Sequence, residues 1–126
     1  MVNLTSILVV DDDPLILSVM LQVLARVVTP STQIITAYNG EEGLRLARQN
    51  LPDVIITDLM MPKMDGFELV ESLRREEISS RTRIIGVSSS GARDARTTAF
   101  RKMCDSFLNK PFMPNELIDK LKCLVA

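Results

Sequence analysis

The chain of 126 residues has no histidine and only two cysteines, Cys104 and Cys123. The two cysteines have 18 residues between them and form no C-x-x-C pair, so the sequence argues against a zinc site and against a disulfide framework. We therefore expect both thiols to be small, buried or half-buried side chains without a redox role.

No apolar run is long enough to cross a membrane. The longest nearly apolar stretch extends from Leu15 to Val28 and is interrupted by Ser18, Gln22 and Arg26, whereas a membrane-spanning helix needs about 20 consecutive apolar residues. Three aspartates precede this stretch, although a signal peptide would place basic residues there. We therefore expect a cytoplasmic protein that does not bind membranes.

Neither sign of charge dominates the composition. The chain has 15 basic and 16 acidic residues, which leaves a formal net charge of -1 at pH 7. This balance provides no general attraction to nucleic acids, and the sequence contains no recognition module for them, so we expect no direct nucleic-acid partner. With 46% hydrophobic and 25% charged residues, we expect residues 1–126 to form a single globular domain without an effector domain.

Short runs rich in β-branched residues alternate with amphipathic helical segments, five of each. We expect strands at residues 7–10, 33–37, 53–57, 83–88 and 105–108, a loop at 109–112, and helices at about 14–27 or 14–28, 41–49, 93–103 and 115–124, with a further helix that begins at Gly66. Apolar strands joined by right-handed helical crossovers form parallel sheets that are covered on both faces. The pattern therefore predicts an α/β fold, a doubly wound three-layer α/β/α sandwich with a five-stranded parallel sheet.

Chemically useful side chains occur where four of the expected strands end. Asp11 and Asp12 follow the first strand, Asp58 follows the third, Ser88 ends the fourth, and Lys110 follows the fifth. The carboxyl ends of parallel strands lie along one edge of the sheet, which is where open α/β sheets bind ligands. We therefore expect these side chains to form a functional site.

The charges of this expected site favour a divalent cation. Three carboxylates and one ammonium give a charge of about -2, and gathering the carboxylates without a counter-ion is costly. Oxygen ligands without histidine or cysteine favour Mg²⁺, with Mn²⁺ as a substitute. The metal could hold a phosphoryl oxygen while Asp58 acts as nucleophile and Lys110 and Ser88 bind the other oxygens. No Gly-rich phosphate loop is present, so the phosphoryl group would arrive on another molecule.

Two other classes of function remain open at this point. An Asp-nucleophile phosphatase of the haloacid dehalogenase type needs a second acid two residues after Asp58, where this chain has Met60. A flavin-binding module can use the same sheet topology, but the acidic cluster would repel the phosphate of FMN. Absorbance in the visible flavin bands would test the second alternative.

Four segments together resemble the signature segments of response regulator receiver domains. They are Ile-Leu-Val-Val-Asp-Asp-Asp-Pro at 7–14, Ile-Ile-Thr-Asp-Leu-Met-Met-Pro-Lys-Met-Asp-Gly at 55–66, Ile-Ile-Gly-Val-Ser-Ser at 84–89 and Phe-Leu-Asn-Lys-Pro-Phe at 107–112. The resemblance covers about residues 5–124, and it implies the flavodoxin-like strand order 2-1-3-4-5. Each segment alone is weak, but all four in order are highly specific.

The resemblance also implies a role for each site residue. Asp58 would be the phosphoacceptor and a metal ligand, with Asp12 as a direct ligand, the Met60 backbone carbonyl as the third, and Asp11 acting through water. Lys110 and Ser88 would hold the phosphoryl group, Ser88 and Phe107 would form the switch, and the bond between Lys110 and Pro111 is often cis in this family.

Receiver domains take a phosphoryl group from a phosphohistidine of a histidine kinase or histidine phosphotransfer protein, and they catalyse only their own phosphorylation and dephosphorylation. The resemblance therefore implies an Mg²⁺-dependent signalling module and no other enzymatic activity. Output would pass through the face built from residues 93–103, 105–108 and 115–124 to a downstream protein target or a fused effector.

The expected helix at 14–28 is apolar on more than one face. Some of its apolar residues can face the sheet, which leaves others unaccounted for, namely Leu15, Leu17, Val19, Leu21 and Val28. A helix of this kind is usually buried or part of an interface. We therefore expect it to contact a second copy of the chain or a neighbouring domain.

The expected helix at 93–103 is basic. It carries Arg93, Arg96, Arg101 and Lys102, which form either a solvated face or a docking site for an acidic partner. The solvated face is the simpler interpretation.

Overall fold

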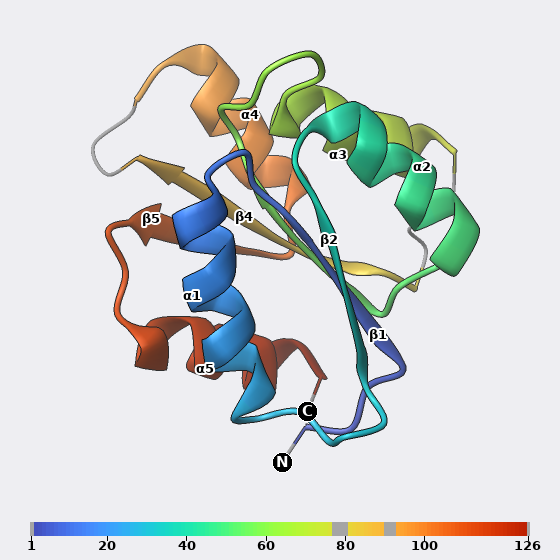
Figure 1. The fold of residues 1–126 in the computed structure, drawn as a ribbon. Helices are drawn as coiled ribbons and strands as arrows, with labels where there is room; N and C mark the ends of the chain where they lie inside the picture. Colours follow the sequence, from blue (N-terminus) through green and yellow to red (C-terminus); the bar gives the residue numbers. More distant parts are fainter. Residues whose placement is uncertain (1, 77–80, 90–92, 126) are drawn as a thin grey trace.

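The computed structural model describes residues 2–76, 81–89 and 93–125, which form one parallel sheet between two layers of helices (Figure 1). The strands are β1 (Ser6–Val10), β2 (Gln33–Ala37), β3 (Val54–Asp58), β4 (Arg83–Ser89) and β5 (Ser106–Lys110). Their order is β2-β1-β3-β4-β5, and the neighbouring strands pair in parallel. The predicted flavodoxin-like, doubly wound α/β/α sandwich is therefore confirmed.

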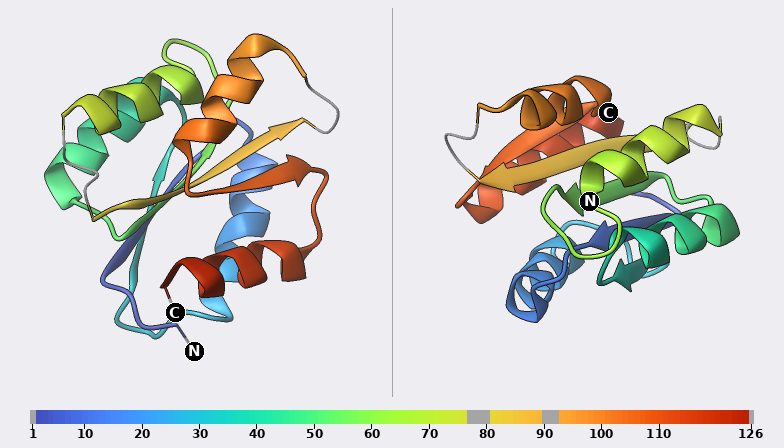
Figure 2. Two further views of the ribbon diagram at one scale, coloured as in Figure 1. Left: turned by 180° about the vertical axis from the view of Figure 1, so that it is seen from behind. Right: turned by 90° about the horizontal axis from the view of Figure 1, so that it is seen from above.

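The helices are α1 (Pro14–Ala25), α2 (Gly40–Asn50), α3 (Gly66–Arg75), α4 (Ala95–Met103) and α5 (Pro114–Val125). Helices α1 and α5 cover one face of the sheet, and α2, α3 and α4 cover the other, as the left view of Figure 2 shows. Strands β1 and β3 lie in the middle of this arrangement and are buried along their whole length. Their carboxyl ends therefore lie in a partly desolvated environment.

Polar side chains mark where four of the helices begin. Asp13, Asn39, Asp65 and Asp94 are the N-caps of α1, α2, α3 and α4, and each side chain accepts a hydrogen bond from a backbone N–H of the first turn. Pro14 occupies the start of α1, where its missing N–H has no structural cost. Local sequence thus determines where these helices begin.

Helix α1 ends earlier than its apolar pattern predicts. The expected helix continued to Val27 or Val28, but α1 ends at Ala25, and Arg26 is its C-cap. Val28 instead forms a parallel β-bridge with Val2. A contact with a distant part of the chain therefore ends the helix before its hydrophobic periodicity does.

The exposure of the α1 side chains also differs from the expectation. Leu17 and Val28, which the sequence left without a core partner, are 3% and 5% exposed. Leu15 and Val19, in contrast, are 76% and 53% exposed. The unexplained apolar surface of α1 is therefore smaller than expected and lies mainly at its N-terminal half.

The end of β5 corrects a second expectation. Asn109 and Lys110 were expected in a loop, but they belong to β5 and pair with Ser88 and Ser89 of β4. The residue before a proline avoids the helical region, and an extended strand satisfies that restriction as well as a loop does. The bond between Lys110 and Pro111 is cis, in agreement with the expectation.

Cys104 is half-buried, as expected, but Cys123 is exposed. The expectation for Cys123 was wrong because α5 directs Leu117 and Leu121 into the core. A residue two positions after Leu121 lies on the opposite side of a helix.

Within the described parts of the chain, no helix combines the length and apolar character needed to cross a membrane.

Candidate functional site

Strands β1, β3 and β5 bring four charged side chains together at the carboxyl edge of the sheet. Carboxylate oxygens of Asp11, Asp12 and Asp58 lie within 4.8 Å of one another. The Lys110 Nζ donates hydrogen bonds to Asp58 Oδ2 at 3.0 Å and to Asp11 Oδ2 at 3.2 Å. Side chains separated by as many as 99 positions in the sequence therefore form one cluster.

Burial makes this cluster electrostatically demanding. Asp11 is 0% exposed and Asp58 is 7% exposed. Burial raises the pKa of Asp58, and the charge of Asp11 adds to the effect, while Lys110 opposes it without cancelling it. For Lys110, burial acts to lower the pKa, but the hydrogen bonds and charges of Asp58 and Asp11 outweigh burial and raise it.

The carboxylates differ in how many of their oxygens are already engaged. Asp11 accepts hydrogen bonds at Oδ1 from the Asp13 N–H and at Oδ2 from Lys110. Asp58 accepts at Oδ1 from the Leu59 N–H at 2.9 Å and at Oδ2 from Lys110. Asp12 is exposed, and its carboxylate forms neither a hydrogen bond nor an ion pair with the residues that the structure describes.

This donor set fits Mg²⁺ or Mn²⁺. The ligands are oxygens alone, and the three carboxylates outnumber the single ammonium, so a divalent cation would balance the site. Asp12 has the greatest freedom to bind such a cation directly. Asp11 and Asp58 each accept one hydrogen bond at each oxygen, and every one of these oxygens keeps a lone pair for a cation or for a metal-bound water.

Asp58 is held in place by its own neighbours in the chain. The Thr57 Oγ1 donates to the Asp58 carbonyl at 2.9 Å, and the Gly66 N–H donates to the Leu59 carbonyl at 2.8 Å. Gly66 begins α3 directly against the Asp58 backbone, where a Cβ atom would overlap the Asp58 carbonyl. Met60, two residues after Asp58, lies in the connection from β3 to α3 and is 69% exposed.

Ser88 and Phe107 lie on neighbouring strands beside this cluster. Ser88 is 3% exposed and pairs with Asn109 in the β4–β5 register, and Gly86 pairs with Phe107. Phe107 is half-buried on the edge strand, in an edge-to-face contact with the buried Phe100 of α4. The two predicted switch residues therefore lie on adjacent strands, two residues apart in register.

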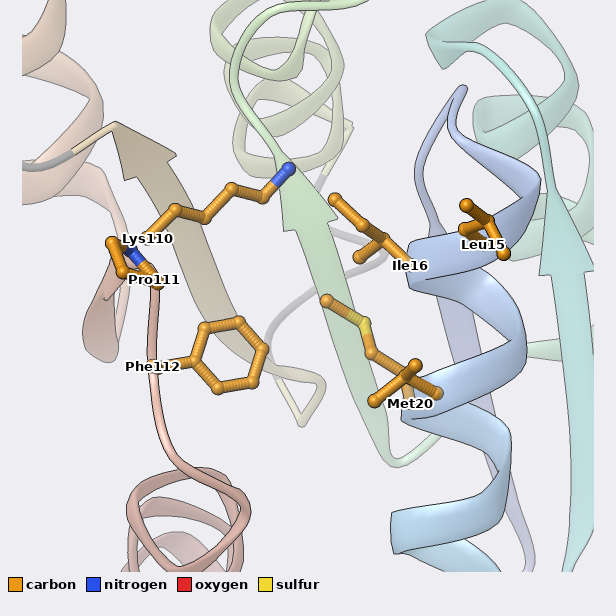
Figure 3. A pocket seen from close by; sticks show the side chains of 7 residues that line it. Leu15, Ile16, Met20, Lys110, Pro111 and Phe112 are labelled. Atoms are coloured by element: carbon orange, nitrogen blue, oxygen red, sulfur yellow. The ribbon is translucent and has the colours of Figure 1, made fainter.

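An apolar pocket of about 400 Å³ adjoins the site between α1 and the connection from β5 to α5. Figure 3 shows the Lys110 amine extending toward the end of β3, while Phe112 faces Met20 of α1. The pocket is lined by Leu15, Ile16, Val19, Met20, Lys110, Pro111 and Phe112. Lys110 thus belongs both to the acidic cluster and to the pocket. The one signal for this pocket in the sequence is the group of apolar residues in the expected helix at 14–28 that had no assigned partner.

Comparisons with known proteins identify the class to which this fold and site belong. A family model described as the response regulator receiver domain matches residues 7–122. Among curated proteins, the chain is 32% identical over 98% of its length to the hybrid signal transduction histidine kinase D of Dictyostelium discoideum. It is 34% identical over 94% of its length to the transcriptional regulatory protein SrrA of Staphylococcus aureus. The chain spans only 8% and 47% of these two proteins.

Solved structures agree with the family model. The receiver domain of the Francisella response regulator 1452 has a TM-score of 0.81 and 30% identity, with 96% of each chain covered. The chemotaxis response regulator CheY4 of Vibrio cholerae has a TM-score of 0.82 and 28% identity, with 95% of this chain and 98% of that chain covered. The chain belongs to the response regulator receiver domains of two-component systems. This assignment favours a signalling module over the phosphatase and flavin-binding alternatives.

Proposed function

We propose that Asp58 is the phosphoacceptor and that it takes a phosphoryl group from a phosphohistidine of a histidine kinase or histidine phosphotransfer protein. The observation that carries this proposal is the position of the Lys110 ammonium, 3.0 Å from Asp58 Oδ2 and 3.2 Å from Asp11 Oδ2. A cation at this distance can stabilise charge that develops on a transferred phosphoryl group. Asp58 lies at the end of β3, which is where a ligand can approach an open parallel sheet.

The other residues have complementary roles in this proposal. Asp12 and Asp58, with the Met60 backbone carbonyl, hold Mg²⁺ or Mn²⁺, and Asp11 supports the metal through water. The metal neutralises charge on the phosphoryl oxygens when it is bound. The Ser88 hydroxyl binds one phosphoryl oxygen and Lys110 binds another. With these groups the domain catalyses its own phosphorylation and dephosphorylation, and we propose no other reaction for it.

Signal output follows from a change of population between two arrangements of the same fold. In the phosphorylated state Ser88 moves toward the phosphoryl group and the ring of Phe107 turns inward. The face formed by α4, β5 and α5 then presents a different surface to a downstream protein target or a fused effector. We place this activity in the cytoplasm.

The pocket beside Lys110 is the proposed contact for the protein that delivers the phosphoryl group. Leu15 and Val19 expose apolar surface next to a residue of the site itself. A partner that buries this surface would bring its phosphohistidine to the same edge of the sheet as Asp58. A second copy of the chain is the alternative occupant, and light scattering at high concentration distinguishes the two.

Mass spectrometry after incubation with Mg²⁺ and acetyl phosphate tests the proposal. The native chain gains the mass of one phosphoryl group, and Asp58→Asn gains none. Asp13→Asn is a matched control, because asparagine preserves the N-cap of α1 and Asp13 has no assigned role in phosphoryl transfer. Equal phosphorylation of the native chain and Asp58→Asn would refute the assignment of Asp58.

A further inference from the structure

An arginine covers the ring of Phe107. The Arg101 Cζ lies 4.4 Å from the centroid of this ring, which is within the range of a cation–π contact. Arg101 is exposed and belongs to the last turn of α4, whereas Phe107 lies on β5. The contact therefore joins two elements of the proposed output face.

The same guanidinium reaches a second residue of β5. Arg101 Nη2 donates a long hydrogen bond of 3.5 Å to Asn109 Oδ1. Phe107 and Asn109 are two residues apart, so they share one face of the strand. Their partners in the β4 register are Gly86 and Ser88. Arg101 thus contacts the two residues of β5 that pair with Gly86 and Ser88 of β4, the strand that carries the proposed phosphoryl-binding hydroxyl.

The surroundings of the Phe107 ring indicate which of its positions Arg101 favours. One contact of the ring is the edge-to-face packing on Phe100, at 5.9 Å between centroids and 74° between planes. A second contact is with the exposed guanidinium of Arg101, and the ring itself is half-buried. Rotation of the ring away from the surface would separate it from Arg101, because the guanidinium stays with α4 on the solvent side.

We propose that Arg101 is a positioning residue that holds Phe107 in its half-buried position and so favours the unphosphorylated state. This inference rests on the proposed function, since it assumes that the ring of Phe107 turns inward when Asp58 is phosphorylated. A cation–π contact at an exposed site is weak, so its loss should increase the population of the inward state about two- to fivefold.

Fluorine NMR of protein labelled with 4-fluorophenylalanine measures this population directly. The chain has four phenylalanines, and Phe107→Leu identifies the resonance of Phe107 by its disappearance. Mg²⁺ with beryllium fluoride, a phosphoryl analogue, defines the resonance position of the inward state in the native chain. Without the analogue, Arg101→Gln should move the Phe107 resonance part of the way toward that position. Arg101→Lys keeps a cation but loses the planar fork, so it should move the resonance less.

Lys102→Gln is the matched control, because it removes the same charge from the neighbouring exposed position of α4. Its Phe107 resonance should remain at the native position. Phosphorylation by acetyl phosphate provides a second readout: Arg101→Gln should increase the rate about two- to fivefold, and in a Phe107→Leu background the same substitution should have no effect. A purely structural or long-range charge effect of Arg101 would persist in that background.

The outcomes separate this inference from the proposed function. If the native Phe107 resonance responds to the phosphoryl analogue but does not move in Arg101→Gln, the role of Arg101 is refuted and the proposed function stands. An equal movement in Lys102→Gln also refutes it. If the native chain shows no response and Asp58 is not phosphorylated, the proposed function fails and this inference fails with it.

Discussion

Lys110 connects the two buried carboxylates of the site through a single ammonium group. Its hydrogen bonds to Asp58 and Asp11 offset part of the cost of burying these acids. The pKa of Asp58 is nevertheless raised, so Lys110 alone does not compensate for burial. A divalent cation at this site would therefore stabilise the ionised carboxylates further.

Replacing this lysine should affect metal binding and phosphorylation in opposite directions. In Lys110→Met the stem remains but the positive charge is absent, so Mg²⁺ should bind more tightly because no ammonium competes for the carboxylates. Phosphorylation by acetyl phosphate should fall about tenfold or more, since one charge that stabilises the transferred group is lost. Calorimetric titration with Mg²⁺ and phosphorylation rates check the two effects, and a parallel loss of both would contradict this role.

The two cysteines should differ in reactivity, because Cys104 is half-buried and Cys123 is exposed. Burial raises the pKa of the Cys104 thiol from 9.0 to about 12, with Asp105 adding to the rise and Arg74 opposing it. Iodoacetamide at pH 8 should therefore modify the exposed Cys123 and leave Cys104 unmodified in the folded chain. Below the pKa of Cys104, its slow reaction should become about tenfold faster for each unit by which the pH is raised, because the thiolate fraction grows by that factor. Peptide mass spectrometry measures the modification of both cysteines.

The same shift has a consequence for stability. The folded pKa of Cys104 is above the unfolded value, so the folded state binds more protons between pH 9.0 and about 12. Stability should therefore fall as pH rises through this window, and Cys104 should contribute no pH dependence below it. Cys104→Ala should remove this part of the alkaline destabilisation in urea titrations, whereas Cys123→Ala, as the exposed control, should retain it.

At the scale of single elements, the beginning of α3 positions Asp58. Gly66 is the first residue of α3, and it lies against the Asp58 carbonyl and the Leu59 backbone. Asp65 caps the helix through a capping box with Glu68, and it also binds Arg96 of α4. Strand β3, α3 and α4 are therefore joined at one point.

Gly66→Ala should disturb this point, because the added methyl group cannot be accommodated without backbone movement. We expect a loss of about 1 to 3 kcal/mol in the free energy of unfolding, together with weaker Mg²⁺ binding as the connection from β3 shifts. Urea titration and calorimetry measure the two effects. Ala99→Gly, at a half-buried position of α4 away from the site, provides a variant of comparable stability loss. Unchanged Mg²⁺ affinity in Gly66→Ala would argue against a positioning role for Gly66.

Helix α1 contributes apolar surface at the mouth of the site. A double variant with Leu15→Ser and Val19→Ser should receive a phosphoryl group from a protein donor about tenfold or more slowly. Both side chains are exposed and line the pocket beside Lys110. Phosphorylation by acetyl phosphate should be unchanged, since this small donor needs no protein contact. Rates with the two donors provide the comparison. Leu51→Ser removes another exposed leucine, one that does not line the pocket, and should alter neither rate.

At the scale of the whole molecule, the site lies on the most buried strands of the sheet, so occupancy should affect global stability. The proposed Mg²⁺ ligands come from the ends of both β1 and β3, so the ion should bind only when these two strands are assembled. At a concentration 100-fold above its Kd, Mg²⁺ should stabilise the fold by about 2.7 kcal/mol. Urea titrations at matched ionic strength measure the increase, and it should be much smaller in Asp12→Asn. An equal increase in that variant would indicate binding elsewhere.

Local sequence was sufficient for most of the fold. The boundaries of the strands and of α2, α4 and α5, and the beginning of α3, agree with the prediction within one or two residues, because caps, turns and hydrophobic periodicity act over a few neighbouring residues. The end of α1 departs further, because the bridge between Val2 and Val28 is a contact between distant segments. The exposure of Cys123 and the burial of Leu17 likewise depend on how whole helices are oriented.

The sequence by itself determined that four chemically useful segments follow parallel strands, and therefore that they meet at one edge of a sheet. Only the tertiary structure decided how they meet: Lys110 between Asp58 and Asp11, a pocket between α1 and Phe112, and Arg101 over the ring of Phe107. The reason is physical. Backbone direction and hydrophobic period are encoded locally, whereas side-chain contacts depend on the packing of elements that are far apart in the chain.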